Sequence, residues 1–229
     1  MSDLERLKHE YADRHFRLKD SNIYSGLNPS YLFVIQQRER ATIELCRKVG
    51  LSSLSNKRIL EVGCGRGDVI QQMMFHRMES QQMHGVELLF NHLVDARKRF
   101  AGANFVSADA QSLPYADHQF DLVLQYTVFS SILNDQIKQN IAEEMLRVLK
   151  PDGLVLWYDF WLNPTNRQTK GIRLAEIHRL FPNCELVAQR VTLAPPIARK
   201  LVPISWTLSL LLEKLRLLNT HYLIAIKPT

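Results

Sequence analysis

Three glycines at alternate positions follow a short run of apolar residues in the first third of the chain. The stretch RILEVGCGRGDVI, residues 58–70, places Gly63, Gly65 and Gly67 in one loop. Glycine has no Cβ, so a glycine loop after a strand usually lets the backbone approach a ligand closely. The chemistry available here therefore depends on which ligand the loop admits.

Two kinds of phosphate-binding loop do not fit this stretch. A P-loop needs a lysine for the phosphates and a following hydroxyl for magnesium, and residues 63–70 contain no lysine. A dinucleotide-binding loop needs its third glycine where Asp68 stands, whereas Gly67 comes one residue early. Glu61, two residues before the first glycine, would repel a pyrophosphate and suits an ammonium or sulfonium group. These features indicate S-adenosylmethionine, which carries both cationic groups and no phosphate.

The segment ILEVGCGRG resembles the first motif of class I S-adenosylmethionine-dependent methyltransferases, and further motifs of that family follow in order. The resemblance implies that Glu87, 24 residues after Gly63 in the segment HGVEL, binds both ribose hydroxyls. It implies that Leu88 packs on the adenine. It also implies that Asp109 accepts a hydrogen bond from the adenine amino group and that Ala110 supplies a backbone amide.

Two later segments extend the resemblance. FDLVLQYTVF is similar to the fourth-strand motif and ends a strand at Gln125, and LRVLKPDGLVLW is similar to the helix-to-fifth-strand signature. The likeness is close over residues 57–161 and looser to residue 229. The C-terminal part resembles that of type 11-like methyltransferases from bacterial polysaccharide or natural-product biosynthesis clusters. The resemblance implies S-adenosylmethionine as cofactor and S-adenosylhomocysteine as product. The implied cofactor residues are Glu61, Gly63, Cys64, Gly65, Gly67, Glu87, Leu88, Asp109, Ala110 and Gln125.

The elements that must position these residues alternate between strand and helix patterns. Strands are expected at 57–64, 81–88, 104–110, 119–129, 153–161, 184–194 and 221–228, and helices at 31–51, 68–78, 90–100, 135–150, 171–181 and 197–218. Pro151-Asp152-Gly153 is expected to stop the helix at 135–150. Such alternation implies a parallel sheet covered on both faces.

We therefore expect an α/β fold, Rossmann-like and doubly wound, with a mostly parallel seven-stranded sheet and an antiparallel last strand. An N-terminal helical lid and a helix inserted before the last strand complete it. The chain is expected to form one domain over residues 1–229. Its parts are an N-terminal extension at 1–52, a cofactor-binding core at 57–161 and a substrate-side part at 162–229.

The charge of the chain is uneven. The net charge is +6, and residues 151–229 hold ten Lys or Arg against five Asp or Glu, so +5 lies in the last third. An anionic substrate, a membrane surface or nucleic acid would fit this excess, as would a solvated basic face. Because these basic residues are scattered and do not cluster, no nucleic-acid partner is expected.

The sequence indicates the cellular compartment of the protein and the redox state of its cysteines less directly than it indicates the cofactor. Cys46, Cys64 and Cys184 are odd in number and far apart, so neither a disulfide framework nor a zinc site is indicated. The charged N-terminal stretch does not resemble a signal peptide. The apolar stretch at 201–218 is interrupted by Pro203 and three charged residues, and it is too short to span a bilayer. A cytoplasmic protein is expected.

The class of methyl acceptor is narrowed mainly by sequence motifs that the chain lacks. Enzymes that methylate amino groups of nucleic acids carry an (N/D/S)-P-P-(Y/F) motif after the fourth strand, where this chain has Gln125 to Val128. Cytosine-C5 enzymes need a cysteine there. A magnesium site of the catechol type needs acids after the fourth and fifth strands, and Gln125 has no charge, although Asp159 could serve. No metal is expected, and a small-molecule acceptor remains.

The expected function is O-methylation of a small natural product or sugar by in-line transfer, with or without a general base. Asp159 and His221 are the candidate bases, and Tyr24, Asn28 and Tyr126 are candidate substrate contacts. The alternatives are a methyltransferase for a lipid-like or quinone acceptor at a membrane surface, and a non-catalytic cofactor-binding partner subunit. A core, lid or membrane-surface role stays open for the apolar helix at 201–218, as does the oligomeric state.

Overall fold

A single seven-stranded sheet organises the molecule. The computed structural model describes residues 3–18, 21–75, 79, 82–163, 166 and 168–229. The strands lie in the order β3-β2-β1-β4-β5-β7-β6. Their bounds are β1 Ile59–Val62, β2 Met83–Glu87, β3 Asn104–Ser107, β4 Phe120–Tyr126, β5 Leu149–Phe160, β6 Cys184–Leu193 and β7 Asn219–Pro228. Pairs from β3 to β5 are parallel, and β7 runs antiparallel to both β5 and β6. The expected fold class is confirmed.

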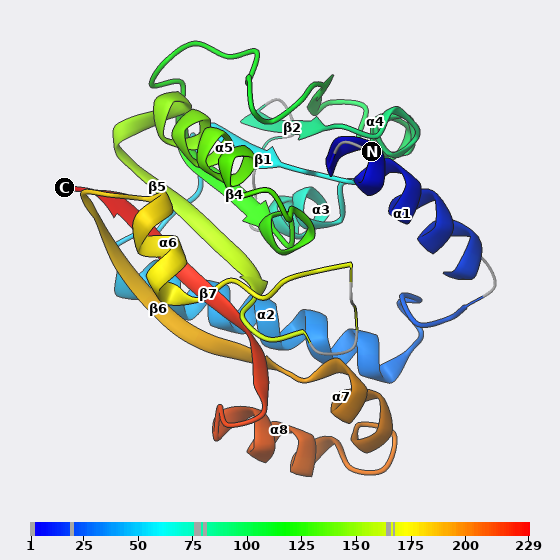
Figure 1. Cartoon of the computed structure of the whole chain (residues 1–229). Helices are drawn as coiled ribbons and strands as arrows, with labels where there is room; N and C mark the ends of the chain where they lie inside the picture. Colours follow the sequence, from blue (N-terminus) through cyan, green and yellow to red (C-terminus); the bar gives the residue numbers. More distant parts are fainter. Residues whose placement is uncertain (1–2, 19–20, 76–78, 80–81, 164–165, 167) are drawn as a thin grey trace.

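Helices cover both faces of the sheet (Figure 1). Their bounds are α1 Asp3–Leu18, α2 Pro29–Lys48, α3 Asp68–Phe75, α4 Phe90–Arg99, α5 Asp135–Val148, α6 Leu174–Leu180, α7 Pro195–Leu201 and α8 Trp206–Lys214, with a short 3-10 helix, η2, at Phe129–Ser131. Apolar residues of α5 and α6 pack into the core on one face, and those of α2, α3 and α4 into the core on the other. Within the described residues, no helix is both long and apolar enough to cross a lipid bilayer.

Local sequence explains where the central elements begin and end. In β1, Ile59, Leu60 and Val62 are fully buried, as expected for a strand covered on both faces. The Asn28 side chain caps α2 by accepting hydrogen bonds from the amides of Ser30 and Tyr31. The expected last residues of the helix after the glycine loop, 76–78, lie outside the described residues.

The sequence-based boundary at Pro151-Asp152-Gly153 is wrong. Helix α5 already ends at Val148, and β5 starts at Leu149, so these residues lie inside the strand. The pairing between β4 and β5 jumps from Phe120–Leu149 to Leu122–Leu154. Proline cannot donate to a sheet ladder, and an irregularity of this kind accommodates it.

The single helix expected at 197–218 is also wrong, because the structure has two. Helix α7 ends at Leu201 and α8 begins at Trp206. Pro203 lacks the amide hydrogen that a continuing helix would use. Ser205 then caps α8, its hydroxyl accepting a hydrogen bond of 3.2 Å from the Leu208 amide.

One edge of the sheet gathers the chain segments that can carry chemistry. Strands β1 to β5 end there, and β7 starts there, since His221 pairs with Phe160. Strand β6 also ends there, because Leu193 pairs with Asn219. We call this the carboxyl edge. In doubly wound folds, ligands bind outside it.

Candidate active site

The glycine loop between β1 and α3 has the geometry that its sequence predicts. Gly63, Gly65 and Gly67 have φ values of +71°, +53° and +80°, which disfavour side chains with a Cβ. A Cβ on Gly63 would collide with Val128, and one on Gly67 would lie 2.9 Å from the Phe100 ring. A Cβ on Gly65 would meet nothing within 4 Å. The loop therefore packs tightly at its two ends and leaves open space at its centre.

Glu87 joins this loop to the end of β2. Its carboxylate is 8% exposed and accepts hydrogen bonds of 2.8 Å from the amides of Gly65 and Leu89. A carboxylate offers about four acceptor positions, so two donors leave room for ligand hydroxyls. The structure thus places Glu87 beside the loop, as the cofactor prediction requires.

Asp109 and Ala110 follow β3 next to the same region. The Ala108 amide donates to the Glu87 carbonyl at 3.3 Å, which holds the two loops side by side. The Asp109 carboxylate accepts hydrogen bonds from the amide of Gln111 at 2.9 Å and from its side chain at 3.1 Å. Leu88 is half-buried at the same edge. These positions are compatible with an adenine site, which stays a prediction.

Glu61 and Arg38 bring opposite charges to the floor of the site. Glu61 is 2% exposed, and burial raises its pKa well above the usual range, while the Arg38 charge opposes that rise. Arg38 extends from α2, with its guanidinium carbon 5.1 Å from the Tyr126 ring centre and 5.3 Å from that of Tyr158. Its Nη2 donates to the Gln72 side chain at 2.8 Å.

Each of these two charged groups keeps one buried atom without a hydrogen-bond partner among the described residues, Oε2 of Glu61 and Nε of Arg38. Buried polar atoms normally have partners, so such a pair marks a place for a ligand. An α-amino acid group, with its ammonium and carboxylate, has the complementary charges. The residues present therefore fit the methionine end of S-adenosylmethionine. Sequence reasoning missed Arg38, whose only signal was a cation on a helix expected to act as a lid.

Gln125 lies near the end of β4, and Thr127 follows the last residue of that strand. Gln125 is fully buried; its Oε1 accepts from the Val128 amide at 3.1 Å, and its Nε2 has no partner within the described chain. Thr127 has a φ of +59°, uncommon for a β-branched residue. Its amide donates to the Tyr158 carbonyl at 2.7 Å and holds this conformation. Strain of this kind clusters at functional sites.

The two candidate bases are not brought together. The Asp159 carboxylate accepts from the Ser130 amide at 3.1 Å and from its neighbour Phe160 at 2.8 Å, and burial raises its pKa to about 6. His221 stacks on Tyr158 at 4.7 Å between ring centres, and burial lowers its pKa to about 3. A neutral imidazole with so low a pKa is a weak proton acceptor. Asp159 suits that role better, and a catalytic role for either residue stays a prediction.

The three candidate substrate contacts differ in how far their side chains are exposed to solvent. Tyr24 is 49% exposed and meets Tyr31 edge to face. Asn28 serves as the helix cap described above, so its side-chain oxygen is already engaged. Tyr126 is 7% exposed beneath Arg38. Cys64 is also buried, and burial raises the pKa of its thiol, as befits a small packing residue.

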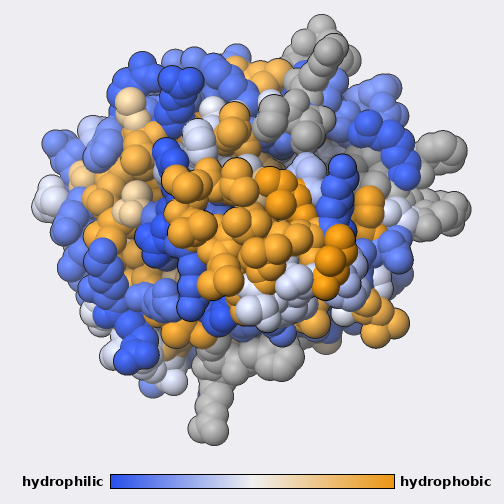
Figure 2. All heavy atoms as spheres, turned by 90° about the horizontal axis from the view of Figure 1, so that it is seen from below, coloured by the Kyte–Doolittle hydropathy of each residue, from blue (hydrophilic) through white to orange (hydrophobic). Residues whose placement is uncertain are grey.

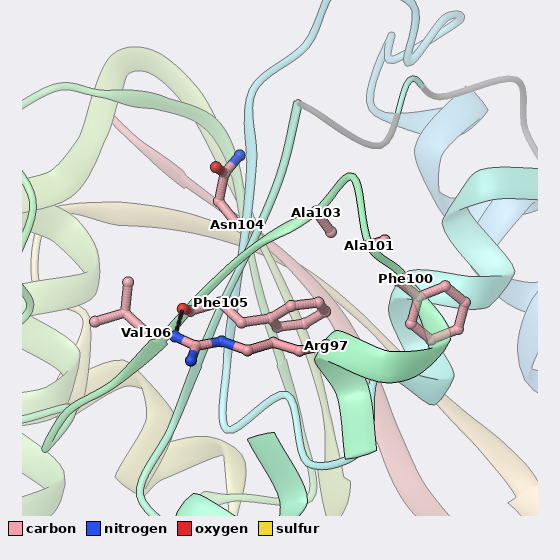
Figure 3. Close-up of a pocket in the computed structure, with 7 residues that line it drawn as sticks. All are labelled: Arg97, Phe100, Ala101, Ala103, Asn104, Phe105 and Val106. Atoms are coloured by element: carbon pink, nitrogen blue, oxygen red, sulfur yellow. Dashed lines mark hydrogen bonds between the residues drawn. The ribbon is translucent and has the colours of Figure 1, made fainter. Parts of the chain in front are cut away.

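A shallow hollow of about 470 Å³ lies elsewhere, at the outer edge of the sheet (Figure 3). It is lined by Arg97, Phe100, Ala101, Ala103, Asn104, Phe105 and Val106. Arg97 crosses it and donates to the Phe105 carbonyl at 2.7 Å. Most of the lining belongs to the end of α4 and the start of β3, so the hollow is not at the carboxyl edge.

Comparison with known proteins matches the same part of the chain. Residues 59–153 match a family model described as a methyltransferase domain. The fatty-acid O-methyltransferase of Mycolicibacterium smegmatis is 32% identical over 167 residues, covering 68% of this chain and 58% of that protein. The ubiquinone/menaquinone biosynthesis C-methyltransferase of Roseobacter denitrificans is 29% identical over 130 residues, covering 54% of this chain and 50% of that protein. The chain thus spans between half and three fifths of these relatives.

The fold is also similar to that of a methyltransferase of known structure. The crystal structure of a TehB-like SAM-dependent methyltransferase from Corynebacterium glutamicum aligns with a TM-score of 0.56 at 15% identity, covering 96% of this chain and 97% of that one. At this identity the likeness concerns the fold alone. The domain match over β1 to the start of β5, with the fatty-acid O-methyltransferase relative and the glycine loop, identifies this part of the chain as a class I S-adenosylmethionine-dependent methyltransferase domain, a family whose cofactor is S-adenosylmethionine.

Proposed function

We propose that the protein transfers a methyl group from S-adenosylmethionine to a small-molecule acceptor at the carboxyl edge of its sheet. The observation that carries this proposal is the convergence of the glycine loop, Glu87 and the Glu61–Arg38 pair at one place. The bound cofactor would supply a methyl group activated by its sulfonium. The protein then has mainly to orient the two reactants and exclude water.

The proposed roles of the cofactor residues follow from their positions. Glu61 would hold the ammonium group and Arg38 the carboxylate, because each has an unsatisfied buried atom. Glu87 would accept from the ribose hydroxyls with the acceptor positions that Gly65 and Leu89 leave unused. Asp109 would accept from the adenine amino group. Such charge-assisted hydrogen bonds contribute about 1.5–3 kcal/mol each.

Two acceptor classes are proposed, an oxygen of a small natural product or sugar, and a lipid-like molecule. The lipid-like class is favoured by a specific observation, the apolar side chains exposed on α8 and after it, such as Leu211 and Leu217. One relative is named as a fatty-acid O-methyltransferase and another for ubiquinone/menaquinone biosynthesis, which supports the same choice. If the acceptor atom is already ionised, as in a carboxylate, no base is needed; otherwise Asp159 is the proposed base.

The test is turnover with defined acceptors. The protein is incubated with S-adenosylmethionine and, in separate reactions, a medium-chain fatty acid, a short-chain quinol and a simple sugar, and S-adenosylhomocysteine release is measured. Release with the fatty acid or quinol supports the lipid-like class. Release only with the sugar would reject it. Cofactor binding without turnover on any acceptor favours the partner-subunit alternative, and absence of cofactor binding would overturn the proposal as a whole.

A further inference from the structure

Large apolar side chains are exposed in one part of the chain far more than elsewhere. Of the thirteen large hydrophobic residues exposed among those described, six lie between residues 204 and 218. They are Ile204, Leu208, Leu211, Leu215, Leu217 and Leu218, and we call them the α7–α8 apolar face. Ile204 is 81% exposed and Leu217 is 76% exposed. Figure 2, which looks onto the side where α7 and α8 lie, shows a broad apolar area bordered by hydrophilic residues.

The apolar face is not simply the outer side of a core helix. Trp206 and Leu210 of α8 point inward, and the Trp206 ring meets that of Phe33 edge to face at 5.1 Å between centres. Leu208, Leu211 and Leu215, spaced by three and four residues, share the exposed side. Helix α8 is therefore apolar on its buried and on its exposed side. In soluble proteins an exposed apolar patch of this kind marks an interaction site.

A shallow hollow extends the face onto α7. It measures about 350 Å³ and is lined by Pro196, Ile197, Lys200, Leu201 and Ile204. All of these except Lys200 are apolar. A flexible apolar chain could lie in such a hollow, whereas it offers few polar groups for a polar ligand.

The charged residues within the segment that carries the face are predominantly positive. Arg199 and Lys200 at the end of α7, and Lys214 and Arg216 at the end of α8, are all exposed. Glu213 is the only acid between residues 195 and 219, and burial raises its pKa. Four cations against one acid give this segment a charge of +3. Apolar side chains rimmed by lysine and arginine complement an anionic lipid surface.

The face also adjoins the proposed site. Strand β6 leads into α7 and α8 leads into β7, and these two strand ends meet at the carboxyl edge. The Ser30 hydroxyl donates to the Ala198 carbonyl at 3.3 Å, which ties α7 to the start of α2. Helix α2 in turn carries Arg38 over Tyr126 at the same edge. An acceptor held in a membrane would therefore lie near the proposed site when the face touches the bilayer.

We propose that the α7–α8 apolar face docks on the surface of an anionic lipid bilayer and presents the carboxyl edge to acceptors that reside there. This deepens the lipid-like version of the proposed function. The apolar residues insert among the acyl chains near the headgroups, and the four cations lie against the headgroups. Docking of this kind is peripheral and reversible, and it weakens as salt rises.

The experiment is flotation of the full chain with phosphatidylcholine vesicles, with and without phosphatidylglycerol. We expect co-flotation with the anionic vesicles, a loss at high salt, and little binding to pure phosphatidylcholine. Removing two cations in Arg199→Gln/Lys200→Gln should weaken binding by about thirty-fold, at the usual contribution of each basic residue. The control Arg179→Gln/Lys227→Gln removes the same charge from exposed positions outside the segment and should float like the wild type.

The apolar contribution is tested separately with Leu211→Ser/Leu215→Ser/Leu217→Ser, which changes exposed side chains and should fold normally. Its control is Ile43→Ser, an exposed apolar side chain of α2 that is not part of the face. Flotation should fall at least ten-fold in the triple variant and stay unchanged in the control. Equal flotation of wild type and triple variant would overturn the proposal, and so would an absence of flotation in the wild type.

A second copy of the chain is the competing occupant, and light scattering distinguishes it. A wild-type dimer that the triple variant dissociates, without vesicle binding, would overturn membrane docking. Calorimetry with S-adenosylmethionine and turnover on a freely soluble short-chain acceptor are measured on every variant. Both should be unchanged, so a failure of docking is distinguishable from a failure of the proposed methyl transfer.

Discussion

The Glu87 carboxylate accepts a hydrogen bond of 2.8 Å from the Gly65 amide, across 22 positions of sequence. This contact fixes the end of β2 against the centre of the glycine loop, where a Cβ on Gly65 would meet only open space. One carboxylate therefore orders the loop, and it is also the group that we propose binds the ribose.

We predict that Glu87→Gln weakens S-adenosylmethionine binding by about 1.5–3 kcal/mol, the usual contribution of hydrogen bonds to a charged group. The amide keeps one acceptor oxygen, but it replaces the other with a donor that faces the Gly65 or Leu89 amide. Isothermal titration calorimetry measures the affinity. Glu143→Gln, exposed on α5, is the control and should bind like the wild type. An unchanged affinity in Glu87→Gln would reject the assigned ribose contact.

Gly63→Ala should lower the free energy of unfolding by about 2–4 kcal/mol. The new methyl group would collide with Val128, and alanine is strained at a φ of +71°. Adding Val128→Ala should restore the part that comes from the collision and leave the strain. Gly26→Ala, where nothing lies within 4 Å, should be close to neutral. Urea unfolding of the four proteins gives the comparison, and equal losses with and without Val128→Ala would show that the contact is unimportant.

Arg38→Gln should weaken cofactor binding and change its pH dependence. Because the Arg38 charge lowers the already raised pKa of Glu61, its removal raises that pKa further. Glu61 holds an ammonium group only when ionised, so affinity should fall as pH decreases, and this fall should begin at a higher pH in the variant. Arg38→Lys keeps the charge and should retain most of the pH profile. Identical pH profiles of cofactor binding in Arg38→Gln and wild type would show that the Arg38 charge does not influence the pKa of Glu61.

The glycine loop and the position of Glu87 beside it could be predicted from sequence because their signals are local. The glycine spacing dictates the loop, and acids at strand ends come to the carboxyl edge in any parallel sheet. Arg38 could not be found in this way, since its position over Tyr126 depends on how α2 docks across the sheet. The break between α7 and α8 had a visible cause in Pro203, but the overall apolar character of the stretch concealed it. The acceptor side has no comparable motif.

Asp159→Asn tests the candidate base through pH. The pKa of Asp159 is raised in the folded protein from an ordinary value of 3.8 to about 6. If it accepts a proton from the acceptor, turnover should rise with pH through about 6, and this limb should disappear in the variant together with most of the activity. His221→Gln should keep the limb, because the His221 pKa of about 3 leaves the imidazole neutral over this range.

The same carboxylate predicts a stability effect that does not depend on turnover. A carboxyl group with a raised folded-state pKa favours folding most below its unfolded value, and this contribution is lost as pH rises from about 4 through about 6. Asparagine does not titrate, so wild type should lose stability relative to Asp159→Asn over that interval, by on the order of 3 kcal/mol. Urea unfolding at several pH values measures the difference. A pH-independent difference would mean that folding leaves the pKa of Asp159 unchanged, with the hydrogen bonds from the Ser130 and Phe160 amides offsetting the effect of burial.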